Sequence, residues 1–117
     1  MAVRRVVPDI NTRQPEATRS FYVDLLGLEV AMDLGWVVTY ASPSNPTAQV
    51  TVTETAAPGL QPGMSIEVSD VDGVHAQALQ RGDDIVYPLT DEPWGVRRFF
   101  LRDPNGIVVN VLEHQSP

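Results

Sequence analysis

The sequence repeats one order of secondary structure, and this repeat limits the possible folds more than any other feature. A short β-branched segment, residues 3–10, precedes a predicted helix at residues 15–26, and three strand-like segments follow before residue 54. After residue 63 the order of strand, helix and three strands begins again. Gly27 and Gly82 stand where each helix should end, because glycine readily adopts the left-handed C-cap conformation. We interpret the pattern as an internal duplication that gives an α+β fold of two tandem βαβββ modules.

The boundary between the modules is predicted from a change in composition. Residues 56–63 read AAPGLQPG, which combines two Pro-Gly pairs with no apolar periodicity. The 117 residues therefore form one domain in our prediction, with residues 1–55 as the first module, 56–63 as a linker and 64–117 as the second module.

In the first helix Ala17, Phe21 and Leu25 recur every four residues, and this spacing predicts that Phe21 packs inward.

The chain closes with a predicted hairpin whose last strand contains an unusual polar residue. Asp103, Pro104, Asn105 and Gly106 form the turn, since proline favours turn dihedrals and glycine accepts a positive φ. The following strand, residues 107–112, is apolar on both faces except at Asn110. A buried amide needs a hydrogen-bond partner, so Asn110 is either satisfied within the core or faces a ligand.

The register of this hairpin decides which side chains lie beside Asn110. If Leu101 pairs with Val108, then Arg97 and Phe99 share the Asn110 face. A bulge at Gly106 would turn the alternate residues, Arg98 and Phe100, toward that face instead. The sequence leaves both registers open.

Composition excludes several classes of function. A net charge of −7 and a pI near 4.5 argue against nucleic-acid binding, which needs clustered Lys and Arg, and agree with a cationic small molecule as ligand. The absence of cysteine excludes thiolate catalysis, disulfides and cysteine-ligated metals. The sequence has no apolar run near 18 residues and no basic-then-apolar leader, so we expect a cytoplasmic protein without membrane contact.

Three groups of residues, in order along nearly the whole chain, resemble one family. They are Ser20-Phe21-Tyr22 with residues 25–28, residues 68–72 leading to Arg81-Gly82, and Pro93-Trp94-Gly95 with residues 99–106. These segments resemble the vicinal oxygen chelate superfamily, which includes glyoxalase I, extradiol dioxygenases, fosfomycin-modifying enzymes and bleomycin-binding resistance proteins. The resemblance implies that the curved sheets of two βαβββ modules form a cleft, often completed by a second subunit, and we therefore predict a homodimer.

Metal enzymes of this superfamily place His or Gln, Glu, His and Glu on four strands that face the cleft. In this sequence the resemblance puts those positions at Val7, at Thr51 with Gln49 as the alternative, at Gly63 with Ser65 as the alternative, and at Asn110. None of the four best matches is His, Glu or Asp, so a divalent metal is disfavoured and no cofactor is expected. His75, on a helix, and His114, in the terminal tail, are predicted to lie outside any metal site.

These observations predict a metal-free small-molecule-binding protein that holds an aromatic or cationic ligand, similar to the bleomycin-resistance type. No catalytic residue is predicted. The alternatives are a metal-dependent glyoxalase-like lyase, isomerase or dioxygenase with non-standard ligands, and an interaction module whose cleft is a dimer seam. The predicted ligand-binding residues are Trp36, Tyr40, Thr51, Trp94, Arg97, Phe99 and Asn110.

Overall fold

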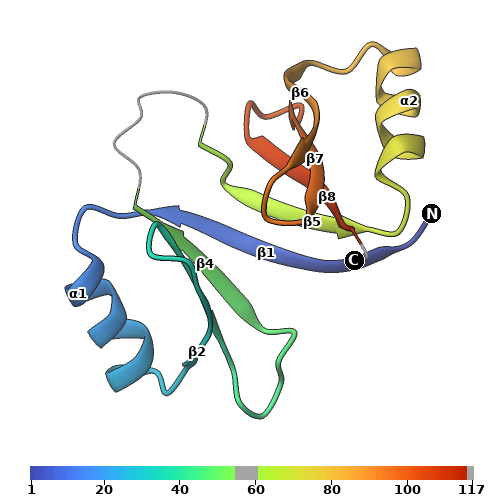
Figure 1. Ribbon diagram of the computed structural model, residues 1–117. Coiled ribbons are helices and arrows are strands. Elements are labelled where there is room, and N and C mark those ends of the chain that lie inside the picture. The colour runs from blue at the N-terminus through green and yellow to red at the C-terminus, as the bar shows by residue number, and fades with distance from the viewer. Residues whose placement is uncertain (55–60, 116–117) are drawn as a thin grey trace. The chain divides into compact units, whose positions relative to one another are not determined.

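The computed structural model describes residues 1–54 and 61–115. The chain divides into two compact units: the first unit is residues 7–59, and the second unit is residues 1–6 together with residues 60–117 (Figure 1). Strand β1 (Val3–Asn11) begins in the second unit and ends in the first. Most of the predicted linker, residues 56–60, lies outside the described residues. None of the helices in residues 1–54 and 61–115 has the length and apolar run needed to span a membrane.

The first unit is a small sheet with one helical segment. Its strands follow the order β2-β3-β4-β1, where β1 and β4 are parallel and the other neighbours are antiparallel. Tyr40, Val50 and Val52 form its buried core, and Tyr22 and Val23 of the helical segment pack against them. The elements are β1, α1 (Pro15–Arg19), η1 (Ser20–Leu25), β2 (Glu29–Asp33), β3 (Val37–Ala41) and β4 (Gln49–Thr53).

The predicted inward orientation of Phe21 is wrong. The helix continues past Arg19 as a π-helix, in which hydrogen bonds run from residue i to i+5 and each turn holds more residues than in an α-helix. The wider turn rotates the apolar face, so Tyr22 stacks on Tyr40 with ring centroids 5.7 Å apart. Phe21 is 50% exposed, and Leu25, on the same predicted stripe, is also exposed.

The second unit has the same order of elements and the better-covered core. Its strands follow the order β5-β8-β7-β6, and the first residues of β1 lie beside β5. Helix α2 covers one face of this sheet (Figure 1). Beneath the helix, Val71, Phe99 and Val111 belong to one buried cluster. The elements are β5 (Met64–Val68), α2 (Val71–Arg81), β6 (Ile85–Glu92), β7 (Val96–Arg102) and β8 (Val108–His114). Together with the first unit, this confirms the predicted α+β class and the repeated βαβββ order.

Helix α2 is capped at both ends, and its C-cap is the predicted Gly82. The Asp70 carboxylate accepts a hydrogen bond from the Gly73 N–H at 3.0 Å, and Gly82 closes the helix with φ 79°. We expect Asp70→Ala to lower the free energy of unfolding by about 1 kcal/mol, because one N-terminal N–H loses its acceptor. Urea denaturation followed by circular dichroism measures this change. Asp70→Ser, which keeps a capping oxygen, should retain most of the stability, and equal losses in both variants would argue against a capping role.

The terminal hairpin adopts the second of the two registers that the sequence leaves open. Asp103 N–H donates to the Ile107 carbonyl at 2.8 Å, which leaves a three-residue loop closed by Gly106 at φ 86°. Three-residue loops of this kind take glycine at the left-handed position. The Asp103 carboxylate holds the loop by accepting the backbone N–H groups of Asn105 and Ile107 at 2.8 and 2.9 Å. Leu101 consequently pairs with Val109, so Arg98 and Phe100 share the face of Asn110, and the predicted site residues Arg97 and Phe99 lie on the other face.

Candidate functional site

The face of the second unit's sheet that lies opposite α2 carries the candidate site. Side chains alternate along a strand, so Val109 and Val111 pack beneath α2 while Asn110 points to the other face. The observed register places Phe100 opposite Asn110 and Arg98 opposite Leu112. We call this surface the Asn110 face; its side chains are Ser65 and Glu67 of β5, Arg98 and Phe100 of β7, and Asn110, Leu112 and His114 of β8.

Asn110 is buried with half of its amide unused. Its Nδ2 donates to Ser65 Oγ at 3.0 Å, and its side chain is only 7% exposed. Its Oδ1 is buried and accepts no hydrogen bond within residues 1–54 and 61–115. An unsatisfied buried carbonyl oxygen costs about 1–3 kcal/mol, so such atoms are rare unless a ligand or water completes them. The Asn110 face therefore presents an unfilled acceptor.

Aromatic rings surround Arg98 beside this acceptor. The Arg98 Cζ lies 4.8 Å from the ring centroid of Phe100, 5.1 Å from that of Trp94 and 5.5 Å from that of Tyr87, all within cation–π range. Glu92 balances the guanidinium charge, with its Oε2 2.7 Å from Nη2. Tyr87 donates its hydroxyl to the same carboxylate at 3.2 Å. The cluster is thus an arginine held between rings, with Trp94 still 40% exposed.

A carboxylate–imidazole pair lies farther along the same face. His114 Nδ1 is 2.7 Å from Glu67 Oε2, and Arg5 Nε donates to Glu67 Oε1 at 2.6 Å. Burial acts to raise the pKa of Glu67, but the hydrogen bonds and charges of His114 and Arg5 outweigh it, so this pKa lies below its ordinary value. The Glu67 carboxylate is therefore ionised at neutral pH and serves as a fixed acceptor for the imidazole.

His114 is not part of a loose tail, in contrast to the sequence-based prediction. It belongs to β8 and pairs with Val96 across the ladder. The next residue, Gln115, donates its N–H to the Gly95 carbonyl at 2.9 Å. The pair with Glu67 had a visible signal in the sequence: Ser65 and Glu67 alternate on one strand, as Asn110, Leu112 and His114 do on another.

The predicted site residues of the first unit occupy different environments. Tyr40 is only 2% exposed and belongs to the core on the helix side, where burial raises the pKa of its phenol, and its predicted ligand-binding role stays a prediction. Thr51 Oγ1 lies 3.1 Å from Thr39 Oγ1 on the opposite face of this sheet. Trp36 is 43% exposed.

Two predicted residues of the second unit lie on the helix side rather than on the Asn110 face. Phe99 has 0% exposure and packs in the core, where the His75 ring meets it edge-on at 4.9 Å. Arg97 pairs with Asp72 of α2 at 2.9 Å and with Asp91 at 3.1 Å. Both corrections follow from the shorter hairpin loop. Of the predicted residues in this unit, the structure brings together only Trp94 and Asn110, through Arg98 and Phe100.

Comparison with known proteins agrees with this architecture. The profile of the Glyoxalase/Bleomycin resistance protein/Dioxygenase superfamily matches residues 3–111. The chain belongs to this superfamily. No protein with a curated description matches the sequence closely enough to count as a relative.

Solved structures of this superfamily and of related enzymes share the fold. A Glyoxalase/Bleomycin resistance protein/Dioxygenase superfamily member from Vibrio splendidus 12B01 has a TM-score of 0.75 at 20% identity, covering 96% of this chain and 99% of its own. Methylmalonyl-CoA epimerase from Mycobacterium tuberculosis has a TM-score of 0.69 at 19% identity, covering 98% and 88%. A Mn(II)-bound glyoxalase from Novosphingobium aromaticivorans has a TM-score of 0.63 at 18% identity, covering 98% and 41%. At these identities the likeness concerns the fold alone.

The residues at the superfamily's metal positions do not fit a divalent ion. Ser65, and not Gly63, lies beside Asn110, since Gly63 precedes β5 and Ser65 pairs directly with Asn110. Both are neutral donors, and in the first unit Val7 is a buried apolar side chain. Within the described residues, no three His, Asp or Glu side chains are grouped as metal ligands.

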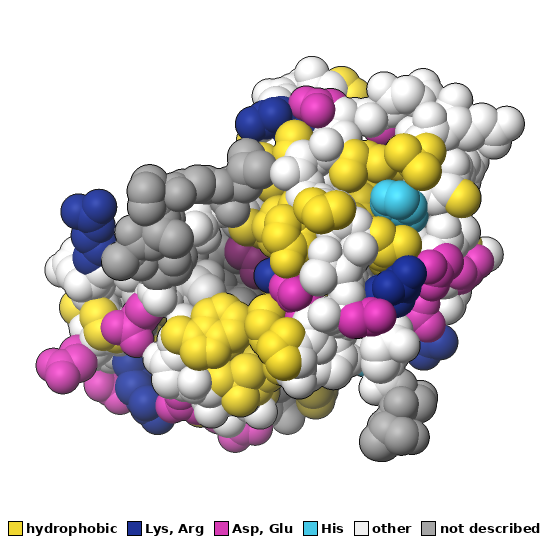
Figure 2. All heavy atoms as spheres, turned by 45° about the horizontal axis from the view of Figure 1, so that its top comes forward, with side chains coloured by type: hydrophobic (Ala, Val, Ile, Leu, Met, Phe, Trp, Pro, Cys, Tyr) yellow, Lys and Arg dark blue, Asp and Glu magenta, His cyan; other side chains and the backbone are white. Residues whose placement is uncertain are grey.

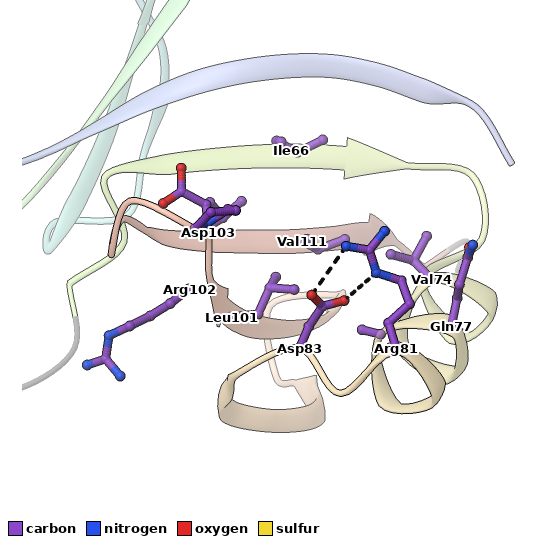
Figure 3. Close-up of a pocket in the computed structure, with 12 residues that line it drawn as sticks. Ile66, Val74, Gln77, Arg81, Asp83, Leu101, Arg102, Asp103 and Val111 are labelled. Atoms are coloured by element: carbon purple, nitrogen blue, oxygen red, sulfur yellow. Dashed lines mark hydrogen bonds and ion pairs between the residues drawn. The ribbon is translucent and has the colours of Figure 1, made fainter.

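A hollow of about 360 Å³ opens on the other side of the second unit, beside α2 (Figure 3). Ile66, Leu101 and Val111 contribute to its apolar floor, and the Arg81–Asp83 ion pair, 2.9 Å between Nε and Oδ2, lies at its edge. None of the predicted site residues lines it. Arg102, another lining residue, pairs with Asp84 at 3.3 Å, and Figure 2 shows several basic side chains beside acidic ones on the visible face.

Proposed function

We propose that this superfamily member binds a small aromatic molecule on the Asn110 face, without a resident metal ion. The observation that carries the proposal is the buried Asn110 Oδ1 that accepts no hydrogen bond within the described residues. A ligand N–H or O–H would supply the missing donor. If the amide were rotated, Nδ2 would become the unused group, so one side of the amide needs a ligand in either orientation.

Charge favours an aromatic ligand over a cationic one. The ring faces around Arg98 already contact its guanidinium, and a second cation there would meet like charge. Glu92 and Glu67, the carboxylates of this region, are paired with Arg98 and Arg5. The half-exposed Trp94 ring offers an aromatic ligand a surface for stacking, which fits the mixed polar and aromatic lining of small-molecule sites.

An enzymatic role is the competing proposal. Its metal-dependent form, a glyoxalase-like lyase, isomerase or dioxygenase, is disfavoured by the neutral donors Ser65 and Asn110. A metal-free form draws support from the Glu67–His114 pair. Homodimer formation and a cytoplasmic location remain predictions, the first supported by membership of a superfamily whose members often dimerise.

Asn110→Val should separate ligand binding from stability. We expect the affinity for the best aromatic ligand to fall about tenfold or more, because the buried hydrogen bond is lost. The free energy of unfolding should change by less than about 1 kcal/mol, because the lost hydrogen bond to Ser65 is offset by removal of a buried oxygen that has no partner among the described residues. Tryptophan fluorescence quenching in a Trp36→Phe background, where Trp94 is the remaining tryptophan, measures binding across a panel of aromatic compounds.

Asn105→Val is the matched control, because Asn105 lies exposed in the turn of the same hairpin. It should leave affinity unchanged. A loss of about 2 kcal/mol or more in Asn110→Val, with no panel compound binding to the parent protein, would show that Asn110 is a structural amide and that the proposed function is wrong.

A further inference from the structure

We infer that the Glu67–His114 pair is a proton-accepting subsite, with His114 Nε2 taking a proton from a weakly acidic O–H or N–H group of the ligand. The inference rests on the proposed binding function and narrows it to ring compounds that carry such a group. His114 contacts the ligand, and Glu67 acts as its positioning residue.

The hydrogen bonds of the pair fix which imidazole nitrogen is free. The ionised Glu67 carboxylate can only accept, so His114 Nδ1 must carry the hydrogen that joins them at 2.7 Å. In the neutral ring the lone pair then lies on Nε2. That nitrogen makes no hydrogen bond to the residues that the structure describes, and the His114 side chain is 51% exposed, so a ligand can reach it.

Three charged groups hold this arrangement in place or lie near it. Arg5 of β1 fixes the other oxygen of Glu67 at 2.6 Å and prevents the carboxylate from turning away. On the β7 side, the residue opposite His114 is the apolar Val96, and the next β7 residue on this face is Arg98, which is paired with Glu92 of β6. No uncompensated carboxylate among these groups opposes an anionic ligand.

The spacing of the strands allows one ligand to contact both parts of the face. Ser65, bonded to Asn110, and Glu67, bonded to His114, are successive residues on the same face of β5. Such residues are separated by roughly 7 Å, which is two steps of a strand. A ring compound with polar groups at its two ends spans this distance.

Proton transfer here balances without a cofactor. The ligand O–H or N–H bond breaks, its electron pair stays on the ligand atom, and the proton forms the second N–H bond of the imidazole. The resulting imidazolium lies between the ligand anion and the Glu67 carboxylate, and both contacts stabilise it.

The test compares 4-nitrophenol with its methyl ether, 4-nitroanisole, which has the same ring but no acidic proton. We expect the wild-type protein to bind the phenol about tenfold or more tightly than the ether near neutral pH, because hydrogen bonds to charged groups are the stronger ones. The absorption band of nitrophenolate should show that the bound phenol is ionised at a pH where the free phenol is largely neutral.

His114→Gln should abolish the preference for the phenol and the ionisation of the bound phenol, so that the phenol and the ether bind with similar affinity. Glu67→Gln, which keeps the shape but frees the imidazole, should reduce both effects. Nitrogen-15 NMR of the wild-type imidazole, without ligand, should show the neutral form protonated at Nδ1.

Three results would overturn the inference. Equal binding of phenol and ether, with no ionised bound phenol, removes the proton-accepting role and leaves the binding function standing. A neutral His114 imidazole protonated at Nε2 also excludes the proton-accepting role, whether or not either compound binds. If neither compound quenches Trp94 fluorescence, the inference and the proposed function both fail.

Discussion

Phe99→Ala will lower the free energy of unfolding by about 3–5 kcal/mol. Phe99 is 0% exposed, lies beneath α2 with Val71 and Val111, and meets the His75 ring edge-on. Truncation removes its burial energy and leaves a cavity that the surrounding strands cannot fill completely. This loss is a large part of the 5–15 kcal/mol that typically stabilises a protein domain. Urea titration followed by circular dichroism measures it.

Phe21→Ala is the matched control, since it makes the same chemical change at a side chain that is 50% exposed. It should cost less than about 1 kcal/mol. A larger loss for Phe21→Ala than for Phe99→Ala would mean that Phe21 belongs to the core and Phe99 does not. Ligand binding by a milder variant, Phe99→Leu, should stay unchanged, because Phe99 does not lie on the Asn110 face.

Glu92→Ala will cost about 2–4 kcal/mol, near the range observed when one partner of a buried ion pair is removed. The Glu92 carboxylate is only 9% exposed, and its loss leaves the Arg98 guanidinium unpaired among three rings. Tyr87 also loses the acceptor of its hydroxyl hydrogen bond. Thermal and urea denaturation should show the same destabilisation, because both measure the free energy of unfolding, which the uncompensated charge lowers.

Two controls test this explanation. The double variant Glu92→Leu with Arg98→Met should recover stability to within about 1 kcal/mol of the wild type, because apolar side chains can replace a buried ion pair. Asp91→Ala, which breaks the neighbouring exposed pair with Arg97, should cost less than about 1 kcal/mol. If the double variant is as unstable as Glu92→Ala, lost packing and not the charge explains the effect.

The fold could be predicted because its signals are local. Gly82 and Asp70 mark the ends of α2 by their own backbone preferences, and strand segments show alternation or β-branched runs. The repeated order of these elements then predicts two tandem βαβββ modules. The π-helix at Ser20–Leu25 escaped prediction, because four-residue spacing looks the same in the sequence whether or not the turn later widens.

The site was harder to predict because it depends on a single register. The turn Asp103 to Gly106 suits a three-residue or a four-residue loop, and the choice reverses the faces of Arg97 and Arg98. Hydrogen bonds from two backbone N–H groups to Asp103 select the shorter loop. Asn110 is recognisable from the sequence because it is a polar residue in an apolar strand. This signal does not depend on the register of the neighbouring strand β7.

Strand β1 also bears on how the protein folds during synthesis. Residues 1–6 are synthesised well before residues 60–117, the rest of the unit to which they belong. Glu67, the partner of Arg5, follows it by 62 residues. At a translation rate of about 5–20 residues per second, Glu67 is synthesised about 3–12 s after Arg5. During that interval residues 1–6 lack the neighbouring strand β5, and unpaired strand edges are prone to pair with other chains. A fragment that begins at residue 64 would lack this strand and the Arg5–Glu67 ion pair.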